Sequence, residues 1–365
     1  MKYYIIAGEA SGDMYGANLI SAIKKKDINA DFRCWGGDRM RKETGALVKH
    51  YNTLDFMGFI EVLINLKAIL NNLNFCKKDI LYFKPDMLIL IDYPGFNLRV
   101  AKFAKNNDIK VCYYISPQVW AWNKQRVNQI KKYVDKLIVI LPFEEEFYIK
   151  YNIQAHFFGH PLLDEVKKIK KSAKNDFYNK YNLDISKKIV ALLPGSRKQE
   201  IKKIFPIMKQ LAMRQNNFHF VVACVNYQFP VKLPSNIKVI YNDTYSLLKA
   251  STYAIVTSGT ATLETALFKV PQVVCYKANI FSFLIAKLLV DLKYISLVNL
   301  ILNKKVVTEL IQGECNINNL NKEFNRLQSK HEIEKIKKSY SKLDEILEGK
   351  NVSNKVADAI MQMIV

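Results

Sequence analysis

The chain has 365 residues, of which half are hydrophobic and 24% are charged, a composition that is typical of globular proteins and excludes the disordered and fibrous classes. This length is more than one ordinary hydrophobic core needs, so we expect two domains. The 55 Lys and Arg residues exceed the 33 Asp and Glu residues, which gives a formal net charge of +22. Such an excess favours a polyanionic partner (nucleic acid, anionic lipid or a phosphorylated substrate), although a biased base composition of the gene would produce it as well.

The six cysteines are scattered without a C-x-x-C pair, which is typical of reduced core residues in a reducing compartment. The histidine spacing indicates no metal site, and we expect no metal and no cofactor. The apolar run after Met1 is too short for a signal peptide. Because no uncharged apolar stretch reaches the roughly 18 residues that span a bilayer, we expect membrane contact to be peripheral.

In chain order, the first half alternates short apolar runs with longer amphipathic ones, which is typical of parallel strands joined by crossover helices. The second half repeats this pattern, so the predicted fold class is α/β, with two doubly wound Rossmann-like domains. The predicted strands are 3–7, 87–91, 111–115, 137–141, 189–193, 218–224, 237–241, 253–257 and 272–276, and the first predicted helices are 14–25 and 98–106.

A segment dense in Lys and Asn, residues 166–188, separates the two halves and contains one predicted short helix. We place the domain boundary near residue 165. This gives an N-terminal domain of residues 1–165 and a C-terminal domain of residues 166–340. The remaining residues, 341–365, are predicted to form a helical tail that can cross back to the first domain.

The first candidate site is the glycine-rich turn after the first strand, because ligands of open α/β sheets bind beyond the carboxyl ends of the strands. Glycines there let the backbone approach a ligand. The turn is neither G-x-G-x-x-G nor a Walker A loop, and its acids would repel a phosphate, so a sugar hydroxyl is the expected ligand. The alternative is a plain turn with a capping aspartate. The candidate residues are Glu9, Ser11, Gly12 and Asp13.

The second candidate is Asp92, which ends a strongly apolar strand just before Pro94. A carboxylate beside apolar walls suits a general base, because desolvation raises its pKa toward the working range. The alternative is an aspartate that caps the next helix. A loop after the third strand adds candidate sugar or acceptor contacts at Ser116, Gln118 and Trp120, whose indole can pack on sugar or acyl chains or else anchor the core.

Two turns in the second half differ from the first turn in charge. One contains Gly195, Ser196 and Arg197, and its arginine at a helix start is suited to bind a diphosphate. The other exposes N–H groups and hydroxyls at a helix start, and its glutamate can accept hydrogen bonds from the ribose hydroxyls. Its candidates are Ser258, Gly259, Thr260, Ala261 and Glu264. The alternative for each is a plain turn with a structural Arg or Glu. We therefore expect nucleotide on the second domain and the neutral sugar on the first.

Several of these segments, taken together and in order, closely resemble the lipid-A-disaccharide synthase family. They are AGEASGD, MGFIEVL, IDYPGFN, SPQVWAW, LPFE, FGHPL, LPGSR and SGTATLE, within about residues 3 to 312. The resemblance implies the GT-B fold, with two Rossmann-like domains facing across a cleft. It also implies an inverting transfer that joins UDP-2,3-diacylglucosamine to 2,3-diacylglucosamine 1-phosphate, gives the β(1→6) lipid A disaccharide 1-phosphate and releases UDP.

The same resemblance assigns roles to single residues. Asp92 matches the proposed base, Arg197 matches a residue associated with the diphosphate, and residues 258–264 match the nucleotide loop. Asn299 matches a functional asparagine in a Ser-Leu-Pro-Asn segment whose proline is Val298 here. Family members often carry a second acid where this chain has Gly95, so proton removal would depend on Asp92 alone.

Membrane contact has one candidate, the apolar stretch 56–70, which is more apolar than a one-faced helix needs. Its predicted membrane-facing residues are Phe56, Met57, Phe59, Ile60 and Leu63. Apolar insertion together with basic charge would hold the enzyme on the cytoplasmic face of the inner membrane, an anionic surface. The alternative is a helix buried in the first domain. A homodimer is left open.

Two other functional hypotheses would explain part of this sequence. Another GT-B enzyme that uses a UDP-sugar, such as an epimerase or a lipid-linked glucosaminyltransferase, would share the folds and the diphosphate site but should lack the IDYPGFN and SPQVWAW pair. A basic scaffold that binds nucleic acid would explain the charge and leave the strand-end motifs without a role. Because no nucleic-acid-binding signature is visible, we expect no nucleic-acid partner.

Overall fold

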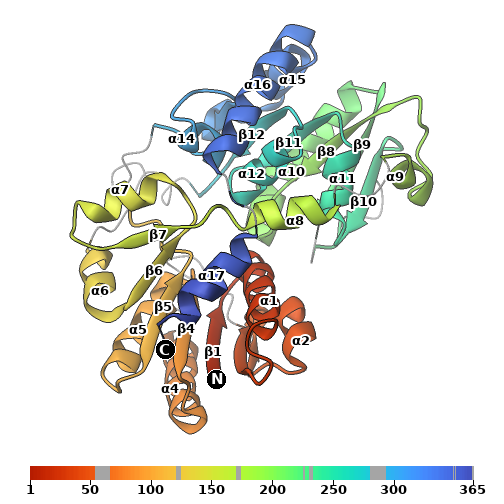
Figure 1. Ribbon diagram of the computed structural model, residues 1–365. Coiled ribbons are helices and arrows are strands. Elements are labelled where there is room, and N and C mark those ends of the chain that lie inside the picture. The colour runs from red at the N-terminus through yellow and green to blue at the C-terminus, as the bar shows by residue number, and fades with distance from the viewer. Residues whose placement is uncertain are drawn as a thin grey trace. The chain divides into compact units, whose positions relative to one another are not determined.

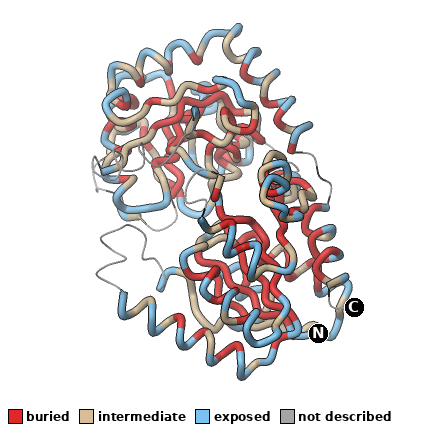
Figure 2. Tube along the Cα trace, turned by 90° about the vertical axis from the view of Figure 1, so that its left-hand side faces the viewer, coloured by how far each residue is buried: buried red, intermediate tan, exposed pale blue. Residues whose placement is uncertain are grey.

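The structure of the chain is a computed structural model (Figure 1). It describes residues 1–53, 66–120, 125–169, 174–224, 227–229, 233–279, 293–347, 349 and 351–363. The chain forms two compact units, one made of Met1–Asp164 with Gly349–Val365 and the other of Glu165–Glu348. In each unit the buried residues gather in the interior (Figure 2), and they include most residues of the sheet together with the inner faces of the helices. No helix in the described ranges is long and apolar enough to cross a bilayer.

The first unit is built on a parallel sheet of seven strands in the order β3-β2-β1-β4-β5-β6-β7. Strands β1 and β4 are neighbours although two strands separate them in sequence, so the direction of winding reverses between them. This is the switch point at which doubly wound sheets bind ligands. The strands are β1 Lys2–Ala7, β2 Asp31–Gly36, β3 Lys49–His50, β4 Met87–Ile91, β5 Lys110–Tyr114, β6 Lys136–Val139 and β7 Ala155–Phe157.

Helices cover this sheet in two groups. Helices α4, α5 and α6 pack in series, and their apolar residues join alternate side chains of the strands in one core. Helix α1 packs against α17. Every residue of β4 is buried, as expected for a central parallel strand covered on both faces. The helices are α1 Ala10–Lys24, α2 Asp38–Thr44, α4 Leu66–Phe83, α5 Pro94–Lys105, α6 Arg126–Tyr133, α7 Phe143–Ile149 and α17 Val352–Met361, with a 3₁₀ turn at Tyr51–Thr53.

The C-terminal helix α17 belongs to the first unit (Figure 1). Its Asp358 forms an ion pair of 2.6 Å with Lys26, just after α1, and the backbone N–H of Ser353 donates to Asp164 at 3.2 Å. The returning segment begins at Gly349 and not at residue 341, because helix α16 continues unbroken to Ile346 within the second unit.

The second unit has a parallel sheet of six strands in the order β10-β9-β8-β11-β12-β13, with its switch point between β8 and β11. Its strands are β8 Lys188–Leu193, β9 Phe218–Cys224, β10 Ile237–Tyr241, β11 Tyr253–Thr257, β12 Gln272–Tyr276 and β13 Thr308–Ile311. Its helices are α9 Lys174–Lys180, α10 Lys198–Arg214, α11 Thr244–Ala250, α12 Thr260–Leu267, α14 Leu297–Ile301, α15 Ile317–Leu327 and α16 Lys330–Ile346, with a 3₁₀ turn at Gln312–Glu314; α8 Leu162–Ile169 spans the division between the units.

Candidate active site

Two predicted segments leave the first sheet side by side at its switch point. Ala7, the last residue of β1, pairs with Ile91, the last residue of β4, so the turn that starts at Gly8 lies next to Asp92. The two segments are in close contact, because a Cβ placed on Gly8 would lie 2.4 Å from Cγ of Tyr93. Glycine at this position therefore allows the ring of Tyr93 to pack on the β1 turn.

The backbone at Asp92 is held in an unusual conformation. Asp92 and Tyr93 have φ values of 45° and 48°, in the left-handed region that costs an L-residue roughly 1–2 kcal/mol. The carbonyl oxygen of Asp92 accepts hydrogen bonds from Asn97 Nδ2 at 2.7 Å and from the Tyr113 hydroxyl at 2.6 Å, and its N–H donates to the carbonyl oxygen of Ile115 at 3.2 Å. These bonds offset the strain and fix the half-buried Asp92 at the carboxyl end of β4.

A second carboxylate, Glu144, lies within electrostatic range of Asp92. Its side chain is 1% exposed, and burial, with a smaller contribution from the charge of Asp92, raises its pKa to about 7. It accepts hydrogen bonds from the backbone N–H of Leu141 at 2.9 Å and from Trp120 Nε1 at 3.2 Å. The strand-end rule already points to Glu144, which follows β6, but nothing in its local sequence indicates proximity to Asp92.

A cation also lies near Asp92. Arg126, the first residue of α6, is half-buried, and this burial lowers the pKa of its guanidinium. It interacts electrostatically with Tyr113, Arg99 and Asp92. Arg126 carries no sequence signal of its own, because it follows a loop and not a strand.

The loop after β5 is anchored on helix α7. The hydroxyl of Ser116, 3% exposed, is hydrogen-bonded to the hydroxyl of Tyr148. The half-buried Trp120 packs edge-on against Phe143, with ring centroids 5.0 Å apart. Gln118, between these anchors, is exposed. The loop is therefore fixed at both described ends, with Gln118 available at its surface.

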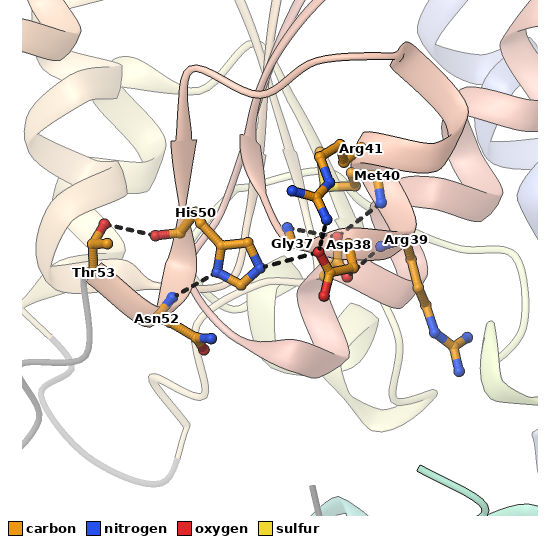
Figure 3. A network of polar contacts seen from close by, with 9 residues as sticks. Gly37, Asp38, Arg39, Met40, Arg41, His50, Asn52 and Thr53 are labelled. Atoms are coloured by element: carbon orange, nitrogen blue, oxygen red, sulfur yellow. Dashed lines mark hydrogen bonds and ion pairs between the residues drawn. The ribbon is translucent and has the colours of Figure 1, made fainter. Parts of the chain in front are cut away.

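Asp13 acts as an anchor for helix α2. Its carboxylate accepts hydrogen bonds from the backbone N–H groups of Gly37 at 2.7 Å, Met40 at 3.0 Å and Arg39 at 3.1 Å. These donors lie at the start of α2, where Figure 3 also shows Asp38 close to His50. A carboxylate is well placed there, because the first N–H groups of a helix lack intrahelical partners.

The other predicted residues of this turn remain nearer the surface. Glu9 and Ser11 are half-buried. Gly12 is buried, and a Cβ there would lie 3.1 Å from Cβ of Ala7. Gly12 thus keeps the first turn of α1 close to the strand, and Glu9 and Ser11 are the polar side chains of the turn that a ligand can reach.

In the second unit, the arginine turn follows β8. Gly195 has a φ of +113°, and a Cβ there would lie 2.5 Å from Oε2 of Glu200. Glu200 accepts a hydrogen bond of 3.4 Å from the N–H of Arg197, and its carboxylate lies 3.6 Å from the Arg197 guanidinium. Arg197 and Ser196 are both exposed, and Tyr276 at the end of β12 interacts electrostatically with Arg197. Glu200 and Tyr276 therefore join the predicted residues at this turn.

The serine turn emerges beside the arginine turn, because Leu193 of β8 pairs with Val256 of β11. Gly259 is exposed and has a φ of +150° with open space at its Cβ position. Glu264 is half-buried and accepts a hydrogen bond of 3.1 Å from the hydroxyl of Tyr245. The N–H groups at the start of α12 and the arginine turn thus lie at one edge of this sheet, next to Ser258, Thr260 and Ala261.

Two further predictions have different outcomes. Asn299 is fully buried, and its amide is bonded to residues of its own unit. The predicted membrane-facing residues lie outside the described residues; they are Phe56, Met57, Phe59, Ile60 and Leu63.

Two parallel Rossmann-like units in one chain, with glycine-containing turns at both switch points, are the architecture of the GT-B fold. A UDP-GlcNAc 2-epimerase from Neisseria meningitidis has this fold, with a TM-score of 0.69 and 13% identity over 100% of this chain and 99% of its own. The predicted GT-B fold is therefore confirmed.

The family is identified by sequence. The family model of lipid-A-disaccharide synthetase matches residues 3–365. A lipid-A-disaccharide synthase of Syntrophus aciditrophicus is 40% identical over 324 residues, which cover 86% of this chain and 84% of the relative. One of Coxiella burnetii is 39% identical over 325 residues, covering 85% of this chain and 84% of the relative. The chain belongs to this family of glycosyltransferases of lipid A biosynthesis, as predicted, and neither an epimerase nor a nucleic-acid scaffold is favoured.

Proposed function

We propose that the enzyme joins UDP-2,3-diacylglucosamine to 2,3-diacylglucosamine 1-phosphate, forming the β(1→6) disaccharide 1-phosphate and UDP. Membership of the family over nearly the whole chain supports the reaction. The observation that carries the division of roles is the pair of switch points, one with Asp92 and the other with Arg197.

In the proposed step, Asp92 takes the proton of the acceptor 6-hydroxyl while that oxygen attacks the anomeric carbon of the donor sugar. The bond from the anomeric carbon to the diphosphate oxygen breaks on the opposite face, and UDP leaves with the electron pair. General bases of this kind contribute roughly 10²–10⁴-fold to rate. The fixed backbone of Asp92 supports this role, because a preoriented base needs no rearrangement before reaction.

Proton removal depends on Asp92 alone in this proposal. Gly95 leaves the loop without a second acid, and Glu144, although close enough to interact electrostatically, is buried and bonded to Trp120 and Leu141. Glu144 and Arg126 instead set the electrostatic environment of the base, one as a carboxyl group and the other as a cation.

The second unit would hold UDP. Arg197 is exposed at the start of α10, where a guanidinium and the helix N-terminus can both face a diphosphate. The N–H groups of the turn 258–261 supply further donors. Glu264, oriented by Tyr245, would accept hydrogen bonds from the ribose hydroxyls. In this scheme Arg197 supplies positive charge to the leaving diphosphate.

The acceptor sugar would contact the edge of the first sheet. The candidates are the residues at that edge whose side chains are exposed (Gln118) or half-buried (Glu9, Ser11 and Trp120). The buried Asp13, Ser116 and Asn299 are bonded within their own units; in this proposal they shape the site without touching a sugar.

Peripheral attachment to an anionic membrane surface would bring the enzyme to its two lipid substrates. The sequence of the stretch 56–70 and the net charge of +22 support it, because apolar insertion and basic charge reinforce each other. Replacing Phe59 and Ile60 by Ser should reduce cosedimentation with anionic vesicles. Unchanged cosedimentation would contradict this attachment site.

The reaction is tested by incubating the purified enzyme with UDP-2,3-diacylglucosamine and 2,3-diacylglucosamine 1-phosphate and analysing the products by mass spectrometry. We expect the disaccharide 1-phosphate and UDP in equal amounts. A control without acceptor should leave the donor unchanged. Because an epimer has the same mass as the donor, the control is also examined by NMR spectroscopy; epimerised UDP-sugar there, with no disaccharide in the full reaction, would instead indicate an epimerase.

A further inference from the structure

The carboxylate of Glu309 on β13 is the centre of a hydrogen-bonded cluster in the second unit. Its Oε1 accepts from the N–H of Ser296 at 2.9 Å, the Ser296 hydroxyl at 2.7 Å and Asn299 Nδ2 at 2.8 Å. Its Oε2 accepts from the N–H of Ile295 at 3.1 Å. Four donors thus converge on one carboxylate, an arrangement that fixes the segment 295–299 against β13.

The side-chain amide of Asn299 links this cluster to Val306 and Val307. Its side chain is fully buried, and its Oδ1 accepts from the N–H groups of Val306 at 2.8 Å and Val307 at 3.0 Å. Its Nδ2 donates to the carbonyl oxygen of Val307 at 2.9 Å and to Glu309. A side-chain amide has two donor hydrogens and two acceptor lone pairs, so its capacity is used within the protein. Asn299 therefore orients Glu309 and has no capacity left for a sugar.

The cluster is connected to the serine turn through Ile295. The Ser258 hydroxyl donates to the carbonyl oxygen of Ile295 at 2.9 Å, and the N–H of Ile295 donates to Glu309. Ser258 directly precedes Gly259, the N-cap of α12. A displacement of Ile295 would consequently be transmitted to the turn at the start of α12.

We propose that Glu309 is a positioning residue for the nucleotide turn 258–264 and acts on it through Ile295. This rests on the proposed function, in which that turn binds UDP. Removing the carboxylate would leave up to four partly buried donors without their acceptor. Such a loss favours rearrangement of the segment, and the turn at Ser258 would lose its fixed partner.

The test compares Glu309→Gln with Glu323→Gln. Glu323 is a suitable control because it also bonds a β13 residue, Thr308 at 3.0 Å, and an arginine, Arg326 at 3.3 Å. We expect Glu309→Gln to bind UDP about tenfold more weakly in calorimetry and to raise KM for the UDP-sugar similarly, with KM for the acceptor unchanged. Glu323→Gln should stay within about twofold of wild type in all three, on the same energy scale.

A double-mutant cycle separates this role from a general loss of stability. Ser258→Ala and Glu309→Gln interrupt the same connection, so the double variant should lose no more UDP affinity than the weaker-binding single variant. Additive losses would overturn the proposal. Should Glu309→Gln not fold, as judged by circular dichroism, Ser296→Ala takes its place, because it removes one donor to Oε1; a weaker UDP affinity is again expected, and an unchanged affinity would overturn the proposal.

The outcomes also distinguish this inference from the proposed function. Wild-type enzyme that fails to bind UDP would contradict the proposed function. Wild-type enzyme that binds UDP, together with a Glu309→Gln variant that binds it equally tightly, would contradict only the positioning role.

Discussion

The ring of Tyr93 lies against the backbone of Gly8, so close that a Cβ on Gly8 would be 2.4 Å from Cγ of the ring. This contact joins the turn after β1 to the loop that carries Asp92. Tyr93 follows Asp92 directly and shares its left-handed backbone, so we expect a displacement of the ring that moves the Tyr93 backbone to move Asp92 as well.

Gly8→Ala should therefore reduce activity. The added methyl group displaces the Tyr93 ring, which we expect to cost about 1–3 kcal/mol of stability and to lower kcat by roughly 10–100-fold, because small misplacements of a base are costly. Gly95→Ala is the matched control. A Cβ at Gly95 meets no atom within 4 Å, and an alanine inside a helix should leave stability equal or raise it by about 0.5–1 kcal/mol. Equal kcat in the two variants, measured beside their urea unfolding curves, would contradict the coupling.

Glu144 should make stability depend on pH. Its pKa is raised from 4.5 to about 7 in the folded protein, chiefly by burial, so the folded state holds this proton more tightly than the unfolded state. The stability it contributes is present in full below about pH 4.5 and is lost as the pH rises through about 7. Relative to Glu144→Gln, wild type should lose stability on the order of 2–3 kcal/mol between pH 4.5 and 8.

Urea unfolding of both proteins across this pH range measures that difference. Glu146→Gln, an exposed site on the same helix, controls for the loss of one carboxylate. A constant difference between wild type and Glu144→Gln at every pH would show that Glu144 does not titrate in this window.

Arg197→Ala should weaken UDP binding. The guanidinium is exposed at the start of α10, and the loss of a charge-assisted contact with a diphosphate should lower affinity by about tenfold or more. Arg214→Ala, at the other end of the same helix and bonded to Asn318, should leave it unchanged. Calorimetry with UDP decides between these outcomes; equal affinity in both variants argues against a diphosphate site at Arg197.

The sequence predicts the strands that carry long apolar runs. All residues of β4 are apolar and buried, and such a run has one interpretation once helices flank it. The sequence does not predict four strands: β2, β3, β7 and β13. Asp31 and Arg33 interrupt the apolar pattern of β2, β3 has only two residues, and β7 has three. Strands β3, β7 and β13 lie at the edges of their sheets, and short strands of this kind are defined by pairing with their neighbours, which local sequence does not encode.

The residues of the candidate site likewise fall into those that the sequence predicts and those that it does not. Asp92, Arg197 and Ser258 follow strong strands, so their position at a sheet edge is predictable. The roles of Asp13 and Asn299 depend on contacts outside their own motifs, with Gly37 at the start of α2 and with Glu309 on β13. Glu309 itself lies in a four-residue strand and gives no local signal of its importance.

In the proposed mechanism, Asp92 activates the acceptor while the second unit holds UDP. Asp92→Asn keeps the size of the side chain and removes the base, so its kcat for disaccharide formation is the most direct measurement, made together with calorimetry of UDP binding. We predict that kcat falls by roughly 10²–10⁴-fold while the Kd for UDP stays within about twofold of wild type, a difference of less than half a kcal/mol. Turnover close to that of wild type would contradict the role of Asp92 as the base.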